Sequence, residues 1–153
     1  MCGIFGIYDI NYNNNIINNV VKGLQKLQHR GKCSYGFSYI NKYNELTTVK
    51  NQGNMREYDI NINTKWCIGH VRYTTSGKSV SDQFISDNEI QPLSGFTSTN
   101  KICIVHNGNI PNILGHDTEY LLNMIISNAD NIEESLINVM NTIPASYSLI
   151  VMY

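Results

Sequence analysis

The first part of the chain changes from a continuous apolar run to apolar residues at helical spacing. Residues 3–8 are apolar or glycine, as is typical of a buried strand. Apolar residues then recur three and four positions apart, which predicts one face of a helix, at Ile16, Ile17, Val20, Val21, Leu24 and Leu27. Asparagines before this helix are suited to cap its start, and Gly31 is expected to end it.

The middle of the chain predicts strands followed by a long polar loop. Residues 35–40 and 46–50 have the composition of two strands, and the turn-forming residues 41–44 join them. Residues 66–71 predict another strand. The segment 74–101 is rich in Ser, Thr, Asn and Gly without periodicity, so we expect a long loop with short ordered pieces.

The last part of the chain predicts two helices between two strands. Residues 102–105 predict a short strand, and residues 147–153 predict a final one. The helical spacing involves Leu121, Leu122, Ile125 and Ile126 in the first helix and Ile132, Leu136, Val139 and Met140 in the second. Asp130 and Asn131 are suited to cap the second helix. Strands at both ends with helices between them predict a single α+β or layered α/β domain over residues 1–153.

Composition narrows the class of protein. The chain has 153 residues and a mass of 17.4 kDa, which fits one domain with a real core. Charged residues make up 15%, the net charge is -1 and no basic block occurs, so we expect no nucleic-acid or membrane partner. The sequence contains neither an 18-residue apolar run nor a signal-peptide pattern, which favours the cytoplasm.

The four cysteines are Cys2, Cys33, Cys67 and Cys103, and they show no CxxC or other metal-ligand spacing. This spacing favours separately placed, reduced thiols over a disulfide framework or a zinc site. We therefore expect one catalytic thiol and three packed thiols, with no metal and no cofactor.

Cys2 has the strongest chemical signal in the chain. Removal of Met1 leaves Cys2 with both a thiol and a free α-amine. A thiol ordinarily titrates near ~8.5 and an α-amine near ~8, so the amine can accept the thiol proton without a separate His or Asp. The alternative is that Cys2 is a small apolar residue entering a strand. Gly3 and Gly6 allow close backbone approach here, which favours the catalytic interpretation.

Two further segments place positive residues at the ends of predicted elements. His29 and Arg30 lie in the last turn of the first helix, where attraction to the helix carbonyls is enough to explain them. Arg72 leads from a strand into a loop with several hydroxyl groups. There it can bind a carboxylate with two parallel hydrogen bonds or form an ordinary surface salt bridge. His70 alone is more typical of a satisfied interior histidine than of a base.

An Asn-Gly pair, Asn107 and Gly108, follows the strand over residues 102–105. Such a pair is ordinary turn chemistry. Its functional interpretation is an oxyanion hole, because the asparagine amide and the glycine backbone N–H are both hydrogen-bond donors. Asp117 opens the next helix, either as its cap or as a ligand for a substrate ammonium.

Together, six segments resemble the class II glutamine amidotransferases, and they occur in the order found in that family. They are residues 1–7, 27–31 (Leu-Gln-His-Arg-Gly), 69–73 (Gly-His-Val-Arg-Tyr), 91–92 (Gln-Pro), 106–110 (His-Asn-Gly-Asn-Ile) and 117–119 (Asp-Thr-Glu). They are most similar to the glutaminase domain of amidophosphoribosyltransferases, which begin purine synthesis. The resemblance covers the chain from its start to about residue 125. It implies an N-terminal-nucleophile hydrolase fold, a four-layer α/β/β/α sandwich of antiparallel sheets.

The resemblance also implies a role for each matching residue. Cys2 would attack the side-chain amide of L-glutamine, and its α-amine would move the proton. Asn107 and Gly108 match the oxyanion-hole pair, Arg72 the ligand of the α-carboxylate, and Asp117 the ligand of the α-ammonium. The remaining matches are one pocket position, Thr75, and three supports of the site, His29, Arg30 and His106.

Three features differ from the family pattern. Nine residues separate Asn107 from Asp117, where the family has a longer segment with a helix, and Pro111 disfavours a helix there. This shortening leaves open whether Asp117 reaches the ammonium. Lys32 and Cys33 stand where the family tends to carry a polar-acidic pair. The chain stops inside its last predicted strand, so we expect a domain shortened at its C-terminus and without a phosphoribosyltransferase domain.

The sequence therefore predicts a glutaminase that hydrolyses glutamine through a Cys2 thioester and supplies ammonia to a separate acceptor synthase, as in purine biosynthesis. The alternative is a non-catalytic glutamine-binding or protein-interaction module with the same fold. A reduced but active enzyme, a subunit completed by another chain and a degenerate remnant are all open outcomes, and so is the oligomeric state.

Overall fold

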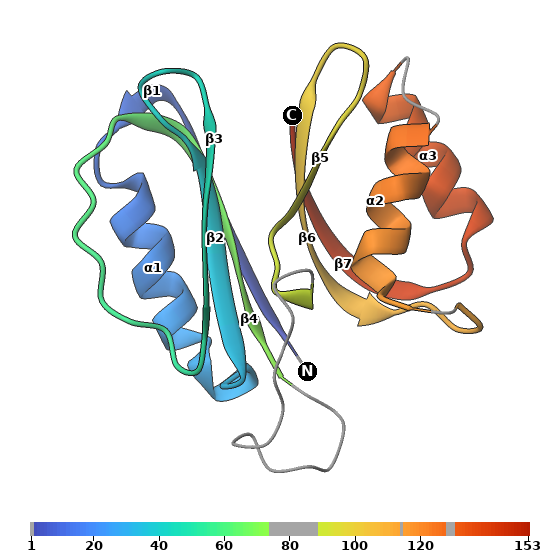
Figure 1. Ribbon diagram of the computed structural model, residues 1–153, viewed down its shortest axis with the longest axis horizontal. Helices are drawn as coiled ribbons and strands as arrows, with labels where there is room; N and C mark the ends of the chain where they lie inside the picture. The colour runs from blue at the N-terminus through green and yellow to red at the C-terminus, as the bar shows by residue number, and fades with distance from the viewer. Residues whose placement is uncertain (1, 74–88, 114, 128–130) are drawn as a thin grey trace.

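Two antiparallel sheets and three α-helices make up the computed structural model, which describes residues 2–73, 89–113, 115–127 and 131–153 (Figure 1). The first sheet has the spatial order β1-β4-β2-β3, with β1 (Gly3–Asn13), β2 (Ser34–Ile40), β3 (Leu46–Gln52) and β4 (Thr64–Arg72). The second has the order β5-β6-β7, with β5 (Leu93–Phe96), β6 (Lys101–Asn109) and β7 (Ser146–Met152). The helices are α1 (Ile16–Lys26), the short 3-10 helix η1 (Gln28–Arg30), α2 (Asp117–Ser127) and α3 (Ile132–Thr142).

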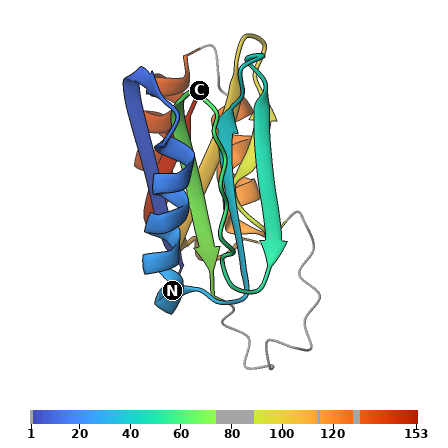
Figure 2. The same cartoon turned by 90° about the vertical axis from the view of Figure 1, so that its left-hand side faces the viewer.

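Helix α1 covers one face of the first sheet (Figures 1 and 2). Alternate residues of a strand point to opposite faces, so β2 directs Tyr35 and Phe37 toward α1. These rings pack with Ile17 and Leu24 of α1, and all four side chains are fully buried. On the opposite face of β2, the Ser38 hydroxyl forms a 2.8 Å hydrogen bond with Thr48 of β3. The alternation thus gives the first sheet an apolar helix-facing side.

Helices α2 and α3 cover the second sheet on its side away from the first (Figure 1). Ile102 and Ile104 of β6 form a buried cluster with Leu121 and Ile125 of α2 and with Val139 of α3. This packing confirms the helical spacing predicted for the first of these helices and most of that predicted for the second, whereas Met140, also predicted to face the core, is 62% exposed.

The two sheets contact each other through their other faces. Ile68 of β4 packs against Cys103 and Val105 of β6, and Ile4 and Ile150 extend this cluster. The protein is therefore α+β with antiparallel sheets, as predicted.

The hairpin predicted at residues 41–44 is confirmed. Asn44 has φ 62°, in the left-handed region that a tight turn requires and that asparagine tolerates. The Asn41 side-chain oxygen accepts hydrogen bonds from the backbone N–H groups of Tyr43 and Glu45 at 2.9 and 3.0 Å. Asn41 therefore closes the turn through its side chain, and Asn44 contributes its backbone angle.

The position of the Asn-Gly pair differs from the prediction. Asn107 and Gly108 lie within β6, not in a turn after it. They are paired with Ser148 and Tyr147 of β7, so a strand far away in the sequence keeps this segment extended. Strand β5 was also missed, since its four residues lie in the segment predicted as a loop. Residues 74–88 of that segment lie outside the described residues.

Gly31 does not end the first helix. Helix α1 ends at Lys26, η1 follows it, and Gly31 has an extended backbone with φ -161°. A Cβ atom at this position would lie 2.6 Å from backbone atoms of Val71 and Arg72. Glycine is required here because the chain passes directly against the end of β4.

The predicted helix caps have mixed outcomes. The Asn15 side chain makes no capping hydrogen bond to α1, so that prediction is wrong. Asn131 does cap α3, accepting from the backbone N–H groups of Glu133 and Glu134, while Asp130 lies outside the described residues. In the part of the chain that the structure describes, every helix is too short or too polar to cross a membrane.

The packing of α1 generates a stability prediction. We expect Ile17→Ala to lower the free energy of unfolding by about 2–5 kcal/mol, because it leaves a cavity in the core under α1. The matched control is Ile137→Ala on α3, where the side chain is 58% exposed and the loss should stay within about 0.5 kcal/mol. Urea denaturation of both variants measures the difference. Equal losses would contradict the placement of α1.

Candidate active site

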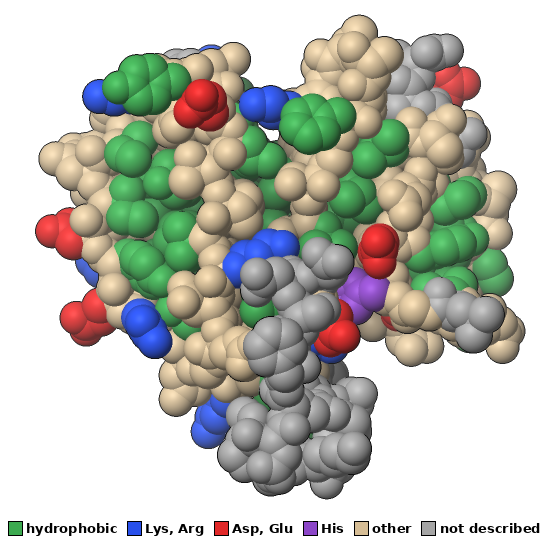
Figure 3. Space-filling view, in the orientation of Figure 1, with side chains coloured by type: hydrophobic (Ala, Val, Ile, Leu, Met, Phe, Trp, Pro, Cys, Tyr) green, Lys and Arg blue, Asp and Glu red, His purple; other side chains and the backbone are tan. Residues whose placement is uncertain are grey.

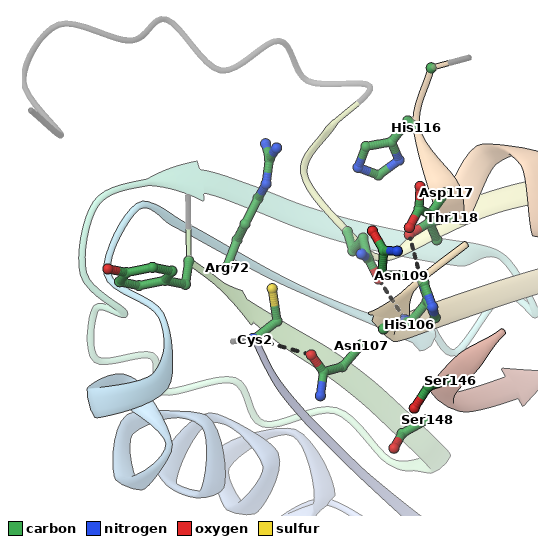
Figure 4. Close-up of a pocket in the computed structure, with 14 residues that line it drawn as sticks. Cys2, Arg72, His106, Asn107, Asn109, His116, Asp117, Thr118, Ser146 and Ser148 are labelled. Carbon is green, nitrogen blue, oxygen red and sulfur yellow. Dashed lines mark hydrogen bonds between the residues drawn. The ribbon is translucent and has the colours of Figure 1, made fainter. Parts of the chain in front are cut away.

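A cavity of about 770 Å³ opens between the two sheets at the ends of β1 and β4 (Figure 4). Its lining comes from both halves of the fold and from the start of α2. The lining residues are Cys2, Arg72, Tyr73, Gln91, His106, Asn107, Gly108, Asn109, Gly115, His116, Asp117, Thr118, Ser146 and Ser148. In the space-filling view, acidic, basic and histidine side chains gather near the middle of the face that is shown (Figure 3).

Hydrogen bonds to its backbone nitrogen and to its carbonyl oxygen hold Cys2 in place. It lies one position before Gly3, which pairs with Val71 at the end of β4. The Cys2 nitrogen donates to Asn107 Oδ1 at 3.2 Å, across the two sheets. The Cys2 carbonyl accepts from Arg30 Nε at 3.0 Å. Figure 4 shows the thiol directed into the cavity. The nitrogen that would become the α-amine is therefore fixed, and the thiol is open to a ligand.

Arg72 ends β4 next to Cys2 and extends its guanidinium toward the mouth of the cavity (Figure 4). Its side chain is 20% exposed, and Nη1 donates to Glu89 Oε2 at 2.7 Å. The backbone of Gly31 packs directly against the backbone of Arg72 at this end of the strand.

Asn107 and His106 are neighbours on β6 and point to opposite faces of the sheet. Asn107 faces the first sheet and Cys2, whereas His106 faces α2, where its Nδ1 lies 3.3 Å from the Thr118 hydroxyl. Gly108 follows, exposed and without a side chain, so the backbone beside Asn107 is open to the cavity. This arrangement can present two hydrogen-bond donors, the Asn107 side-chain amide and the Gly108 backbone N–H, to one ligand atom.

Gln91 lies just before the start of β5 and adds a hydrogen bond to β6. The backbone pairing of β5 with β6 begins at Leu93 and Ile104. Two positions earlier, the buried Gln91 side chain accepts from the His106 backbone N–H at 2.6 Å. The Gln91 side-chain oxygen thus accepts the hydrogen bond that a backbone carbonyl of a neighbouring strand would otherwise accept, and this bond holds the cavity wall in place.

Asp117 is the first residue of α2, and its carboxylate reaches back toward β6. Its Oδ2 accepts from the Ile110 backbone N–H at 2.9 Å, which closes the short connection between β6 and α2. Asn112 and Gly115 have φ 64° and 105°, so this connection turns without a helix in its described residues. The sequence predicted no helix around Pro111, and the structure agrees.

Burial favours the neutral form of two histidines that line the cavity. It lowers the pKa of His106, while the nearby Asp117 carboxylate acts in the opposite direction. It also lowers the pKa of His116, and the Arg72 guanidinium lowers it further. His70 of β4 is fully buried, and desolvation lowers its pKa to about 3. The interior position expected for His70 is confirmed, but neither of its ring nitrogens has a hydrogen-bond partner among the described residues.

The structure brings together most of the residues singled out from the sequence. Cys2, Arg72, His106, Asn107, Gly108 and Asp117 line one cavity. Arg30 contacts the Cys2 carbonyl. His29 does not join them, because it is exposed and its Nδ1 lies 3.0 Å from the Lys26 carbonyl oxygen. Thr75 lies outside the described residues.

Several cavity residues were missed by the sequence reasoning. Ser146 and Ser148 are two positions apart on β7, so strand alternation could have placed them on one face. His116 directly precedes Asp117 and has no periodic signal of its own. Glu89 lies in an irregular polar segment, and nothing in the local sequence indicates that it meets Arg72. Within the described residues, no group of three His, Cys, Asp or Glu side chains could hold a metal ion.

Known proteins with similar sequences come from two kinds of enzyme. An amidophosphoribosyltransferase from Methanothermobacter thermautotrophicus is 30% identical over 177 aligned positions, covering 99% of this chain and 35% of the relative. One from Pyrococcus horikoshii is 36% identical over 118 positions, covering 74% and 23%. A glutamine–fructose-6-phosphate aminotransferase from Streptococcus pyogenes is 31% identical over 125 positions, covering 79% and 19%. No family model matches the chain.

These matches show that the chain is homologous to the class II glutamine amidotransferases, which confirms the resemblance seen in its motifs. Within that class, its relatives are amidophosphoribosyltransferases and glutamine–fructose-6-phosphate aminotransferases. The chain spans at most about a third of the length of these relatives. The first alignment extends over 177 positions although this chain has 153 residues, so the relative contains residues in that span that have no counterpart here.

The burial of His70 predicts a pH dependence of stability. The unfolded imidazole binds a proton near its ordinary pKa of 6.5, whereas folded His70 binds one only near 3. Unfolding therefore takes up a proton between these values. The free energy of unfolding should fall by about 1.4 kcal/mol per pH unit as the pH drops through this window. We expect His70→Phe to remove this part of the slope in denaturation measured from pH 6.5 to 4. An unchanged slope would show that His70 titrates normally.

Proposed function

We propose that this protein hydrolyses L-glutamine to glutamate and ammonia, with Cys2 as the nucleophile after removal of Met1. The observation that carries the proposal is the contact between the Cys2 nitrogen and Asn107 in a cavity that also holds Arg72 and Asp117. A nucleophile, a hydrogen-bond donor group and two opposite charges are the parts that an amino-acid amidase needs. The names of the relatives support glutamine as the substrate.

The proposed pose follows the charges of the cavity. The α-carboxylate of glutamine binds the Arg72 guanidinium, which suits a planar carboxylate. The α-ammonium faces the Asp117 carboxylate at the start of α2. The side chain then extends toward Cys2, which lines the same cavity. A cavity of about 770 Å³ is of the size that binds small molecules.

In the proposed reaction, the Cys2 thiol passes its proton to the α-amine as the sulfur attacks the amide carbon. The carbonyl oxygen gains charge and is stabilised by the Asn107 amide and the Gly108 N–H. The C–N bond breaks and ammonia leaves with the proton. Water then attacks the thioester, which releases glutamate and restores the thiol.

The wider context is part of the same proposal. The chain is a single glutaminase domain, and its helix–sheet–sheet–helix arrangement supports the four-layer N-terminal-nucleophile hydrolase fold. The ammonia passes to a separate acceptor enzyme or a completing subunit, and the greater length of the relatives supports this part of the proposal. Purine biosynthesis is the proposed setting, from the amidophosphoribosyltransferase relatives. Four free cysteines support a reducing compartment such as the cytoplasm.

The test of the proposed function is glutamate release by the protein without Met1. We expect Cys2→Ser to lower the rate at least about 10³-fold, because a serine hydroxyl is a weaker nucleophile. A diazoketone analogue of glutamine should alkylate Cys2 selectively. Cys33, Cys67 and Cys103 are buried, and burial raises the pKa of Cys103 to about 11. They serve as internal controls in peptide mass spectrometry.

Three results would contradict the proposal. Equal rates for the wild type and Cys2→Ser would remove Cys2 as the nucleophile. An intact mass that shows Met1 retained would exclude the mechanism, because the Cys2 nitrogen would then be in a peptide bond and not a free α-amine. Glutamine binding without turnover by the correctly processed protein would identify a non-catalytic module.

Asn107→Asp tests the oxyanion role. Aspartate keeps an oxygen that can accept from the Cys2 nitrogen, but it loses the amide donor. We expect kcat to fall by about 10²–10³-fold, with a much smaller change in KM. The matched control is Asn109→Asp, which places the same charge in the same cavity two residues along β6. If both variants lose the same activity, charge rather than the Asn107 donor is responsible.

A further inference from the structure

Glu89 is a carboxylate already bound to the guanidinium that is proposed to hold the substrate carboxylate. The Arg72 Nη1 donates to Glu89 Oε2 at 2.7 Å, a distance typical of a charge-assisted hydrogen bond. A glutamate side chain and the α-carboxylate of an amino acid present the same chemical group. They are therefore equivalent ligands for the same donor.

The backbone that carries Glu89 is anchored on both sheets. Ile90 is 1% exposed and packs against Cys33, which is next to β2. Gln91 bonds to the His106 backbone of β6 at 2.6 Å. The Glu89 side chain itself is 44% exposed. The fold thus keeps this carboxylate next to Arg72, and the carboxylate is also exposed to water.

Glu89 also changes the charge balance of the cavity mouth. A glutamine zwitterion needs one positive and one negative partner, and Arg72 and Asp117 supply them. Glu89 adds another carboxylate beside Arg72. Its charge acts on His116 and raises the pKa of that residue, as the Asp117 carboxylate does, whereas Arg72 lowers it. When the substrate carboxylate binds Arg72, it must displace Glu89 or lie beside it. Displacement breaks the ion pair between Arg72 and Glu89, and a position beside Glu89 brings two negative charges together, so both arrangements oppose binding.

We propose that Glu89 competes with the substrate α-carboxylate for Arg72 and so weakens glutamine binding. This inference rests on the proposed function. The pair is partly exposed, and such ion pairs are weak and easily exchanged. Competition of this strength changes affinity by severalfold and leaves the chemistry at Cys2 unchanged.

The test is Glu89→Gln, which keeps the size of the side chain and removes its charge. We expect KM for glutamine to fall about threefold, with kcat within twofold of the wild type. Glu89→Asp keeps the charge and should restore much of the wild-type KM. The control for loss of one negative charge is Glu57→Gln, an exposed position outside the cavity, which should leave KM unchanged.

Two analogues identify which part of the substrate is affected. Glutaramate retains the carboxylate of glutamine and lacks its amine, so it should inhibit Glu89→Gln about threefold more strongly than the wild type. 4-Aminobutanamide lacks the carboxylate and should gain nothing. An unchanged or higher glutamine KM in Glu89→Gln, or an equal gain for both analogues, would overturn the proposal.

A binding measurement separates this inference from the proposed function. Titration calorimetry with glutamine compares Cys2→Ser with the double variant Cys2→Ser/Glu89→Gln, so no turnover is needed. Tighter binding by the double variant supports competition even if the wild-type protein releases no glutamate. Active wild-type protein with equal binding by the two variants would reject competition and leave the proposed function standing.

Discussion

The antiparallel pairing of β1 with β4 is the constraint on which the site depends. Its register places Gly3 opposite Val71, and therefore Cys2 beside Arg72 at the same end of the sheet. Because side chains alternate, Val71 packs under α1 while Arg72 faces the second sheet. A slip of one residue would exchange these faces and bury the arginine in the core. The hydrophobic pattern that fixes the core thus also fixes the direction of the charged group.

The second requirement is contact between the two sheets. Cys2 belongs to the first sheet and Asn107 to the second, and their 3.2 Å hydrogen bond joins segments 105 residues apart in the sequence. The apolar cluster around Ile68 and Val105 lies along the same interface. Burial of apolar surface stabilises this interface and so holds the polar groups at its end in place. The polar site is therefore organised by an apolar interface.

Elements with a strong local signal could be predicted from the sequence. Helix α1 has apolar residues at helical spacing, and the hairpin at residues 41–44 has its own turn chemistry. The motif residues that line the cavity were also found, because each follows or opens a predicted element. What was missed depends on distant partners: β6 continues to Asn109 because β7 pairs with it, and Gly31 is needed where the chain passes against β4. Glu89 belongs to the same group, since only the fold brings it to Arg72.

The short connection between β6 and α2 can be reconciled with a role for Asp117 at the site. In a longer segment, the packing of an additional helix could direct such a carboxylate. Here Asn112 and Gly115 adopt left-handed backbone angles, which reverse the chain within a few residues. The Asp117 carboxylate then closes the turn through one oxygen, Oδ2, bonded to Ile110. A carboxylate has two oxygens and can accept several hydrogen bonds, so closing this turn does not exhaust its capacity. The shortened connection therefore holds Asp117 at the cavity wall by hydrogen bonding and turn geometry instead of helix packing.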